Sequence, residues 1–363
     1  MLIVFFVQLS PKNRYLLMRG NDNVLVAKDG NKEIWAQHAS RRKIYQCPEC
    51  QAPVIVKKGR VNIAHFAHLR VADCQAASGE TAEHLTGKEQ LYQWAQSRGW
   101  SPRLEYYCSA INQRPDVLVN VGGQPTVLEF QCSPLSIRRL NERNTGYQQQ
   151  GWRFYWLLGS PYRRHLGRRK CAQFIQQLND RLVVPFWNIQ LSRLDYRYYP
   201  RRLPRVLSTR QLNHQLNELR SSNEKSILTL HQQLLTMGHY LMDCPLFCHV
   251  VDHEVPSTKH GLILWRIKVA MFLTEVPIFT CWSLTQWAAM LTEIGKGEWT
   301  ETPCLPRRHY LVRLEVTWLT KLLLQERYLI RDGNNLILIR HPTWFDSWCE
   351  KRTALQKTFT GSR

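Results

Sequence analysis

The stretch RPDVLVNVGGQPTVLEFQ, from Arg114 to Gln131, decides the fold of the central part of this chain. Two short apolar runs each carry one carboxylate, since Asp116 opens the first run and Glu129 lies late in the second. The Gly122-Gly123 pair between the runs is typical of the tight turn of a β-hairpin. The pattern predicts neighbouring strands whose two acids converge on one divalent cation. A metal-dependent phosphodiesterase needs that arrangement.

Length and charge narrow the class of protein. A chain of 363 residues is too long for one ordinary domain and suits two or three. The formal net charge of +21 indicates a polyanionic partner, and we expect that partner to be nucleic acid. The 11 cysteines are irregularly spaced, and several lie inside apolar runs. This usage favours a reduced, cytoplasmic protein over a disulfide framework.

The N-terminal residues are apolar but do not have the form of a targeting segment. The run MLIVFFVQL has no basic segment before it and is far shorter than a membrane span. We therefore expect no signal peptide and no membrane insertion. The sequence VLVAKDGNKEIWA, from Val24, is typical of an opening strand and turn. We predict that residues 1–23 are a non-native or disordered extension, with the true start codon further along the chain.

A cluster of cysteines and histidines lies within residues 24–75, which are expected to form short strands and turns. Its members are Cys47, Cys50, His65, His68 and Cys74. A CxxC pair puts two thiolates on one tight turn, and a second pair of soft ligands about fifteen to twenty residues further on completes a tetrahedral zinc site. Five candidates compete for four positions, so either both histidines serve or His68 and Cys74 do. We expect the Zn²⁺ to be structural and to supply much of the folding free energy of this module.

Residues 76–215 form a second predicted domain. A helix is expected at 81–98, followed by the hairpin strands and by an aromatic strand at 153–159. The order of these elements predicts an α/β domain whose sheet is mostly antiparallel. Together with the remainder of the chain, it indicates the α+β class.

Residues 216–363 are predicted to form a mainly helical C-terminal domain. Apolar residues recur at helical spacing over 227–242, 262–275, 283–294 and 311–325. A hairpin pattern follows at 328–339. Helices followed by a hairpin fit a winged-helix-like fold.

Short motifs follow one another in a fixed order between residues 24 and 210. They are CPEC, HFAH with a following cysteine, AEHLTGK, LEYYC, RPDV, EFQCSPL, NERNTGY and WLLG. This run resembles the competence protein CoiA family of Gram-positive bacteria. The resemblance implies a zinc-finger-like N-terminal domain and a central, restriction-endonuclease-like nuclease domain of the PD-(D/E)xK class. It also implies a role in recombination of incoming DNA during natural transformation, with DNA and other recombination or competence proteins as partners.

The resemblance further implies a catalytic set. Asp116 and Glu129 match the two acids that bind Mg²⁺ or Mn²⁺ in this class of nucleases. Glu83, on the preceding helix, matches an acid that some members add. Gln131 stands where the class has a lysine, and a neutral amide positions water but contributes no positive charge. Cleavage activity depends on whether another residue supplies that charge.

Five further residues are expected to support the site, namely His84, Lys88, Glu105, Arg143 and Tyr147. Lys88 is a candidate for the missing charge because His84 and Lys88 are four residues apart and share a helix face. The competing interpretation of that face is ordinary solvation. For Glu105 we expect a structural ion pair rather than metal binding. Arg143 and Tyr147 resemble a helix motif that follows the core strands in recombination-type nucleases.

A basic region follows the predicted nuclease core. Residues 161–210 contain twelve lysines and arginines but only two acids, Asp180 and Asp195, and aromatic residues lie between them. Such a surface engages backbone phosphates and exposed bases, although single tyrosines are better explained as core residues. The cations that we expect to contact DNA are Arg138, Arg139, Arg163, Arg164, Arg168, Arg169 and Lys170.

Two functions remain open on this sequence. The first is a Mg²⁺-dependent DNA nuclease that acts on DNA during natural transformation and recombination. The second is a catalytically inactive DNA-binding accessory protein that keeps the nuclease frame and promotes recombination of incoming DNA. The glutamine at position 131 and the large basic region motivate the second.

Overall fold

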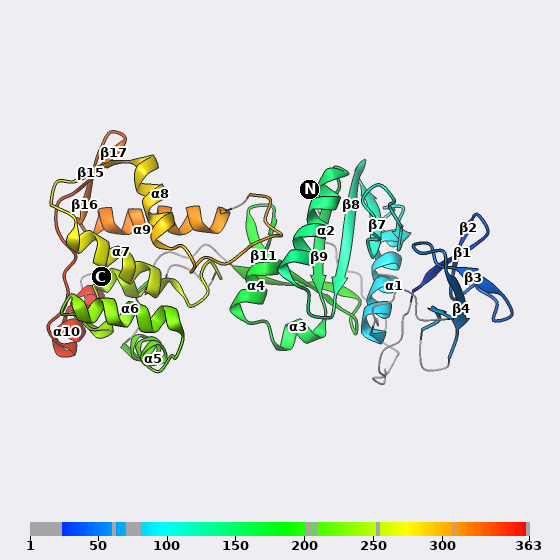
Figure 1. Ribbon diagram of the computed structural model, residues 1–363, viewed down its shortest axis with the longest axis horizontal. Helices are drawn as coiled ribbons and strands as arrows, with labels where there is room; N and C mark the ends of the chain where they lie inside the picture. Colours follow the sequence, from blue (N-terminus) through cyan, green and yellow to red (C-terminus); the bar gives the residue numbers. More distant parts are fainter. Residues whose placement is uncertain are drawn as a thin grey trace. The chain divides into compact units, whose positions relative to one another are not determined.

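The computed structural model describes residues 24–59, 63–69, 81–199, 205–206, 209–251, 255–307 and 309–360. These residues form a mixture of sheets and helices, so the predicted α+β class is confirmed. The chain divides into two compact units, Met1–Tyr198 and Tyr199–Arg363 (Figure 1). Residues 1–23, predicted to be an extension, and the candidate ligand Cys74 lie outside the described residues.

The N-terminal module is an antiparallel sheet of short strands in the order β2-β1-β3-β4-β5. The strand and turn predicted from Val24 are present, because β1 pairs with β2 across a turn at Gly30-Asn31. Tyr45 and Phe66 meet edge to face in its small core, with ring centroids 5.2 Å apart. The strands are β1 (Val26–Asp29), β2 (Lys32–Trp35), β3 (Ile44–Gln46), β4 (Pro53–Lys57) and β5 (His65–His68).

The central sheet of the first unit contains the predicted hairpin. Strands β7 (Val117–Val121) and β8 (Gln124–Gln131) are antiparallel and are joined by Gly122-Gly123. Both glycines have positive φ, +59° and +83°, which a two-residue hairpin turn of this kind requires. The aromatic strand β9 (Arg153–Leu158) pairs with β8 in parallel.

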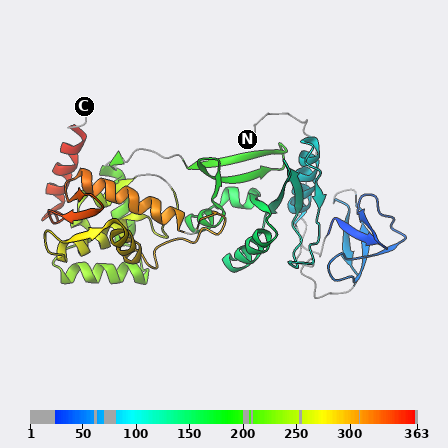
Figure 2. The same cartoon turned by 90° about the horizontal axis from the view of Figure 1, so that it is seen from above.

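Further strands extend this sheet on both sides of β7, β8 and β9. The strand order is β10-β11-β9-β8-β7-β6, and β12 pairs with β11 alongside it. The long green strands of this part of the chain lie side by side in Figure 2. The basic region therefore contributes strands to the sheet as well as surface cations. The additional strands are β6 (Arg103–Leu104), β10 (Gln176–Leu178), β11 (Arg181–Asn188) and β12 (Arg193–Tyr199).

Two helices cover the central sheet from opposite faces. Helix α1 (Ala82–Ser97) agrees with the predicted helix and begins at Thr81, whose hydroxyl accepts a hydrogen bond from the N–H of His84. Helix α2 (Ile137–Gln149) packs its Tyr147 against the face of the sheet away from α1. A Cβ atom at Gly87 would lie 2.0 Å from the ring of Phe130, so α1 needs glycine there to approach β8.

Two short helices follow β9 and carry much of the basic sequence. They are α3 (Ser160–Arg164) and α4 (Arg168–Phe174). Tyr162 and Phe174 anchor them in the core with ring centroids 5.3 Å apart. The arginines of these helices are left on the surface.

The second unit is mainly helical, as predicted. The helix predicted over 227–242 is wrong in its C-terminal part: α6 ends at Thr236, and Gly238 takes a φ of +79° that a helix does not continue. The elements are β13 (Arg205–Val206), α5 (Thr209–Arg220), α6 (Lys225–Thr236), η2 (Leu241–Asp243), η3 (Leu246–His249), β14 (Val250–Val251), α7 (Leu262–Glu275), β15 (Cys281–Ser283), α8 (Leu284–Ile294), α9 (Tyr310–Gln325), β16 (Leu329–Asp332), β17 (Asn335–Leu338) and α10 (Trp348–Thr360). Among the helices that the structure describes, none combines the length and the apolar character that crossing a membrane requires.

Candidate active site and metal centre

Asp116 lies directly before β7 and is held by helix α1. Its Oδ1 lies 3.2 Å from the Nζ of Lys88, and its Oδ2 lies 3.2 Å from the Nε2 of His84. Oδ2 also accepts a 2.8 Å hydrogen bond from the N–H of Phe130 on β8. Burial alone would raise the pKa of Asp116, but Lys88 and His84 outweigh it and hold that pKa well below its usual range. Asp116 is therefore a carboxylate at neutral pH.

Lys88 is shared between two buried carboxylates. Its Nζ lies 2.8 Å from Oε1 of Glu105 as well as near Asp116, and the residue is only 1% exposed. The solvated-face interpretation of Lys88 is therefore wrong. Burial would raise the pKa of Glu105, but the charges of Lys88 and Arg114 outweigh it and lower that pKa. The structural ion pair expected for Glu105 is formed.

Glu105 also connects the central sheet to the N-terminal module. Its Oε2 accepts hydrogen bonds from the N–H groups of Leu25, at 2.9 Å, and Val26, at 3.2 Å. The backbone N–H of Glu105 in turn donates to the carbonyl of Asp116 at 2.9 Å. The N-terminal module thus contacts a residue that touches Lys88 directly.

Glu129 projects from β8 toward helix α2. Arg143 and Tyr147 of that helix both donate hydrogen bonds to its Oε1. Arg143 also donates to the hydroxyl of Tyr147 at 2.8 Å and to the carbonyl of Arg114 at 3.2 Å. Burial raises the pKa of Glu129 to about 7, and the charge of Asp116 adds to the rise although Arg143 opposes it. The two acids therefore influence each other's ionisation while different helices hold them.

The other two predicted catalytic residues contact the segments that follow β8 and β9. Glu83 accepts hydrogen bonds from the N–H and the hydroxyl of Ser160, both at 2.6 Å. Gln131 donates through Nε2 to the carbonyl of Ser133 at 2.6 Å. Among the described residues, three ligating Asp, Glu, His or Cys side chains lie within 4.8 Å of one another only in the N-terminal module. Glu83, Asp116 and Glu129 are thus not drawn together into a three-ligand cluster.

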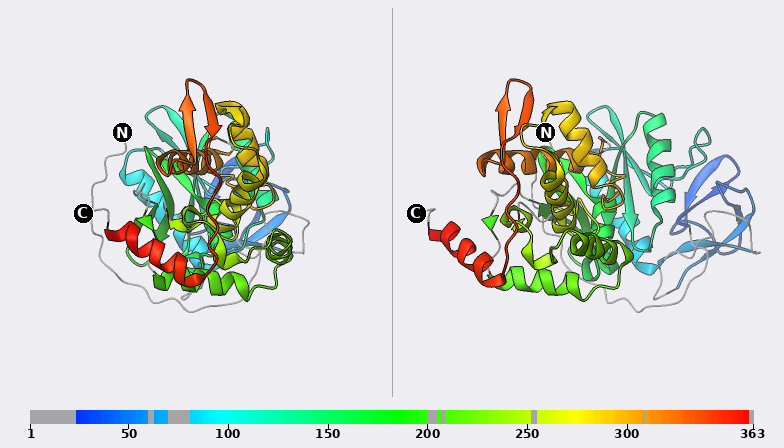
Figure 3. Two further views of the ribbon diagram at one scale, coloured as in Figure 1. Left: turned by 90° about the vertical axis from the view of Figure 1, so that its left-hand side faces the viewer. Right: turned by 60° about the vertical axis from the view of Figure 1, so that its left-hand side comes forward.

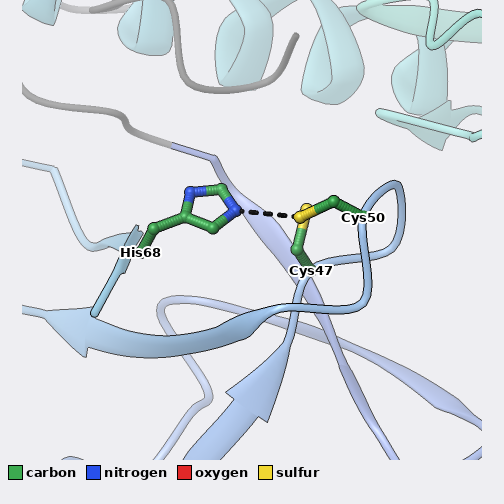
Figure 4. Close-up of side chains that lie close together, drawn as sticks. All are labelled: Cys47, Cys50 and His68. Carbon is green, nitrogen blue, oxygen red and sulfur yellow. Dashed lines mark hydrogen bonds between the residues drawn. The ribbon is translucent and has the colours of Figure 1, made fainter. Parts of the chain in front are cut away.

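That cluster in the N-terminal module joins Cys47, Cys50 and His68. Figure 4 shows their side chains pointing toward one another, and Cys50 Sγ lies 3.3 Å from His68 Nε2. Cys47 directly follows β3, and His68 ends β5. Two thiols and one imidazole are donors that suit zinc, so the residues present fit that metal. A fourth ligand is needed to complete a tetrahedral site.

The remaining candidates for zinc are placed differently. His65 is 8% exposed, and its Nδ1 lies 2.8 Å from the carbonyl of Ile63, outside the cluster. Cys74 lies outside the described residues. The structure thus brings together three of the five predicted zinc ligands.

The turn that carries the two cysteines has the form of a metal-binding knuckle. Burial raises the pKa of the Cys47 thiol, while hydrogen bonds from the N–H groups of Cys50 and Glu49 oppose the rise. The same N–H groups are suited to stabilise a thiolate once a metal is bound. Gln51 closes the turn with a φ of +60° and donates its N–H to the carbonyl of Cys47 at 3.0 Å.

The predicted DNA-binding cations lie on α2, α3 and α4. Arg138 and Arg163 pair with Glu142 and Asp195, at 2.9 Å and 2.8 Å. The side chain of Lys170 is half-buried and donates to the carbonyl of Leu135 at 3.0 Å. The cations that are exposed are Arg138, Arg139, Arg163, Arg164, Arg168 and Arg169.

Most aromatic residues of the basic region are core residues. Tyr162, Phe186, Trp187 and Tyr199 are each less than 10% exposed, whereas Tyr198 is 50% exposed. The competing interpretation, in which single aromatic residues belong to the core, is confirmed for these four. The arginines rather than the aromatic rings form the accessible part of this surface.

The structure adds partners that the sequence analysis missed. Ser160 is the hydrogen-bond partner of Glu83, and Leu25 and Val26 bind Glu105 through backbone N–H groups. No pattern in the sequence marks the two backbone donors. Ser160 offers one signal, since it follows WLLG directly and opens a helix with Pro161 in its first turn.

Comparisons with known proteins agree with the division of the first unit. A family model described as "Competence protein CoiA, nuclease-like domain" matches residues 80–190. A second, "Competence protein CoiA, N-terminal domain", matches residues 27–77. Both regions are therefore similar to domains of the competence protein CoiA family. The resemblance drawn from the motifs is thereby confirmed.

A curated relative covers part of the same region. Over 124 residues, which make up 34% of this chain, the sequence is 36% identical to the competence protein CoiA of Bacillus subtilis (strain 168). The match spans 33% of the length of that relative. No solved structure matches the chain. The CoiA assignment thus rests on the N-terminal and nuclease-like domains.

Proposed function

We propose that the nuclease-like domain is a Mg²⁺-dependent phosphodiesterase that cuts DNA. One observation carries the proposal: Asp116, directly before β7, and Glu129, on the paired strand β8, are buried carboxylates, and the charge of Asp116 adds to the raised pKa of Glu129. Buried acids with perturbed pKa values are typical of functional sites.

The donor set suits magnesium. Mg²⁺ prefers oxygen ligands, takes few from the protein and keeps several waters. Asp116 and Glu129, with the carbonyl of Phe130, would hold such an ion. When bound, Mg²⁺ or Mn²⁺ activates water and offsets negative charge on the phosphate.

Lys88 supplies the positive charge that Gln131 does not. Its ammonium is held between Asp116 and Glu105, so the charge is fixed before DNA arrives. A preorganised charge in a poorly solvated site stabilises a transition state more than a mobile surface lysine does. His84 orients the carboxylate of Asp116 from the same helix.

The exposed arginines of α2, α3 and α4 provide affinity for the DNA backbone. Exposed cations release counterions from the phosphates, and the gain is independent of base sequence. We propose that the substrate is DNA handled during natural transformation, in the cytoplasm and together with other recombination or competence proteins. The family and the printed name of the Bacillus subtilis relative support this step.

The test is a cleavage assay on the purified full chain. Labelled single-stranded, duplex and branched DNA are incubated with Mg²⁺ or Mn²⁺, and products are separated by size. Cuts that vanish in Asp116→Asn and in Glu129→Gln support the proposal. Glu142→Gln, at an exposed carboxylate on α2, is the matched control and retains cleavage. Absence of products from every substrate contradicts the proposal.

A second function is favoured by one observation. Each of the two acids is already neutralised by a cation of its own chain, Asp116 by Lys88 and Glu129 by Arg143. A catalytically inactive accessory protein that binds DNA needs only such a stable frame and the basic surface. In that case DNA binding survives Asp116→Asn and Glu129→Gln, and no substrate is cut.

A further inference from the structure

The second unit contains three helices and a hairpin that follow one another in the order expected for a winged-helix-like fold. Along the chain, α7 is followed by β15, α8, α9 and the hairpin strands β16 and β17. The three strands form one antiparallel sheet in the order β15-β17-β16. The hairpin projects beyond α8 and α9, as Figure 3 shows. We call residues 329–338 the wing hairpin.

Side-chain contacts fix α7, α8 and α9 into one body. Trp265 of α7 donates through Nε1 to the carbonyl of Leu291 on α8, at 2.9 Å. Trp287 of α8 donates to the hydroxyl of Thr320 on α9, at 2.8 Å. Both tryptophans belong to the core that also receives Leu336 of the wing hairpin. The helices and the hairpin therefore present their outer surfaces in a fixed arrangement.

Helix α9 has two different faces. Its inner face fills the core of the unit with Leu311, Val312, Val316, Leu319, Leu322 and Leu323. Its outer face carries exposed residues at a spacing of four, namely Arg313, Thr317, Lys321 and Gln325. Glu315 is the acid of this helix, but it is fully buried and accepts a 2.7 Å hydrogen bond from Ser257. The exposed face of α9 therefore presents cations and hydrogen-bonding groups without a carboxylate.

The wing hairpin adds a further cation beside a tight turn. Gly333 has a φ of +56°, and the Nε of Arg331 donates to its carbonyl at 2.9 Å. Residues 330–335 are all exposed. Asn334 and Asn335 add amide donors, and Asp332 is the acid of this turn. The hairpin is thus mostly polar and projects its side chains into solvent.

We propose that α9 and the wing hairpin form a second DNA-binding site, specific for duplex DNA. A helix with its side chains is about 10–12 Å wide and fits the major groove of B-DNA, which is about 12 Å wide. In helix-turn-helix proteins the second helix of the pair enters this groove while neighbouring segments contact the backbone. A site for single strands relies on several exposed aromatic rings for stacking, and the outer face of α9 does not offer them. The proposal does not require that the nuclease-like domain cuts DNA.

The first test measures binding to a labelled duplex by the full chain without divalent metal. Arg313→Ala/Lys321→Ala is compared with Arg220→Ala/Lys225→Ala, which removes the same charges from exposed positions on α5 and α6. We expect the first variant to lose at least about tenfold in duplex affinity. We also expect the slope of log affinity against log salt concentration to become shallower by about two, because each phosphate contact contributes about one to that slope. The control keeps the wild-type values. Melting curves establish that both variants fold.

A second measurement locates the DNA directly. A photoreactive benzoylphenylalanine replaces Thr317 in one protein and Thr229 in another. Both threonines are exposed, and both hydroxyls bond to the carbonyl four residues earlier, at 2.8 Å. Cross-linking of the duplex from position 317 and not from position 229 supports the site. Unchanged duplex affinity in Arg313→Ala/Lys321→Ala, or equal cross-linking from both positions, overturns it, whatever the cleavage assay shows.

Discussion

The ammonium of Lys88 lies 3.2 Å from Oδ1 of Asp116, in a site where Lys88 is 1% exposed. The same ammonium lies 2.8 Å from Glu105. One cation therefore balances two buried carboxylates at the open end of the β7–β8 hairpin. Its position on α1 gives the site a fixed positive charge although β8 carries glutamine where a lysine was expected.

Removing that charge tests both stability and catalysis. In Lys88→Met, Asp116 and Glu105 lose their shared cation, and loss of one partner of a buried ion pair costs about 3–5 kcal/mol. We expect a lower urea midpoint and a loss of at least about 100-fold in single-turnover cleavage, which is typical for a preorganised electrostatic contact. Lys43→Met, which breaks an exposed pair with Asp29, is the control and changes neither quantity appreciably. Wild-type cleavage by Lys88→Met would contradict the assigned role.

Gln131→Lys tests whether position 131 still accepts the usual charge. Gln131 ends β8 and is half-buried, so a lysine at this position reaches the same end of the hairpin. When Gln131→Lys is added to Lys88→Met, we expect the cleavage rate to rise about tenfold above that of Lys88→Met alone, because the new lysine returns a cation to the transition state. Ser133→Lys, two residues further on and exposed, is the matched control. Equal rescue by both lysines would show that only net charge matters.

The pH dependence of stability reports on Glu129. Its pKa rises from an ordinary value of 4.5 to about 7, chiefly through burial. A group whose pKa is higher in the folded than in the unfolded state stabilises the protein below the unfolded value, and this contribution is lost as pH rises through the folded value. We therefore expect wild-type stability to fall between pH 4.5 and about 7 relative to Glu129→Gln. Parallel urea midpoints for the two proteins across this window would rule out the raised pKa.

Cleavage has the opposite dependence on pH. Holding Mg²⁺ requires ionised Glu129, so the single-turnover rate is expected to increase as pH rises through about 7. Asp116 contributes no transition in this range, since its pKa is held far below it. A rate that is flat from pH 6 to about 8 would separate Glu129 from the rate-determining chemistry.

The local features of this fold were readable from the sequence. Gly122-Gly123 predicted the β7–β8 hairpin because a two-residue turn needs positive φ at both positions. Thr81 and the helical spacing predicted α1, and the end of α6 was missed although Gly238 marks it. Strand β11 was missed because it contains Pro185, which argues against a strand interior.

The contacts of the candidate site were not readable, because they join distant parts of the chain. Ser160 binds Glu83 across 77 residues, and Leu25 binds Glu105 across 80 residues. Sequence spacing showed only that His84 and Lys88 share a helix face. Which acid that face meets depends on how α1 packs against the sheet.

Metal removal tests the N-terminal cluster. Zinc supplies folding free energy to small modules, so we expect one bound zinc per chain and loss of protected amides in β3, β4 and β5 when a chelator removes it. Cys50→Ser is expected to lose the metal by elemental analysis. Cys281→Ser, an exposed cysteine in the second unit, is the control and retains it. Full zinc content in Cys50→Ser would exclude this cysteine as a ligand.

Cys74→Ser tests the fourth ligand. The described cluster holds three donors, and His65 lies outside it. If Cys74 completes the site, its substitution weakens zinc binding by at least about tenfold, while His65→Asn leaves the affinity unchanged. The measurement is competition with a chelator of known affinity. The reverse pattern would assign the fourth position to His65.

Glu105→Gln tests whether the N-terminal module helps to position Lys88. The carboxylate of Glu105 receives the N–H groups of Leu25 and Val26 on one oxygen and Lys88 on the other. An amide has one acceptor oxygen and no charge, so it serves only one of these two sides. We expect faster hydrogen exchange at Leu25 and Val26, together with at least about a tenfold loss of cleavage.

The two effects of Glu105→Gln are separable. Glu142→Gln removes an exposed carboxylate and is the control for loss of charge. If Lys88 is positioned through Glu105, the cleavage defect appears in the maximal rate and not in DNA affinity, because the basic surface is untouched. Faster exchange at Leu25 and Val26 with a normal rate would mean that Glu105 only anchors the module. Normal hydrogen exchange at Leu25 and Val26 with slow cleavage would mean that Glu105 acts on Lys88 alone. In that case the N-terminal module would still pack against the sheet without the carboxylate.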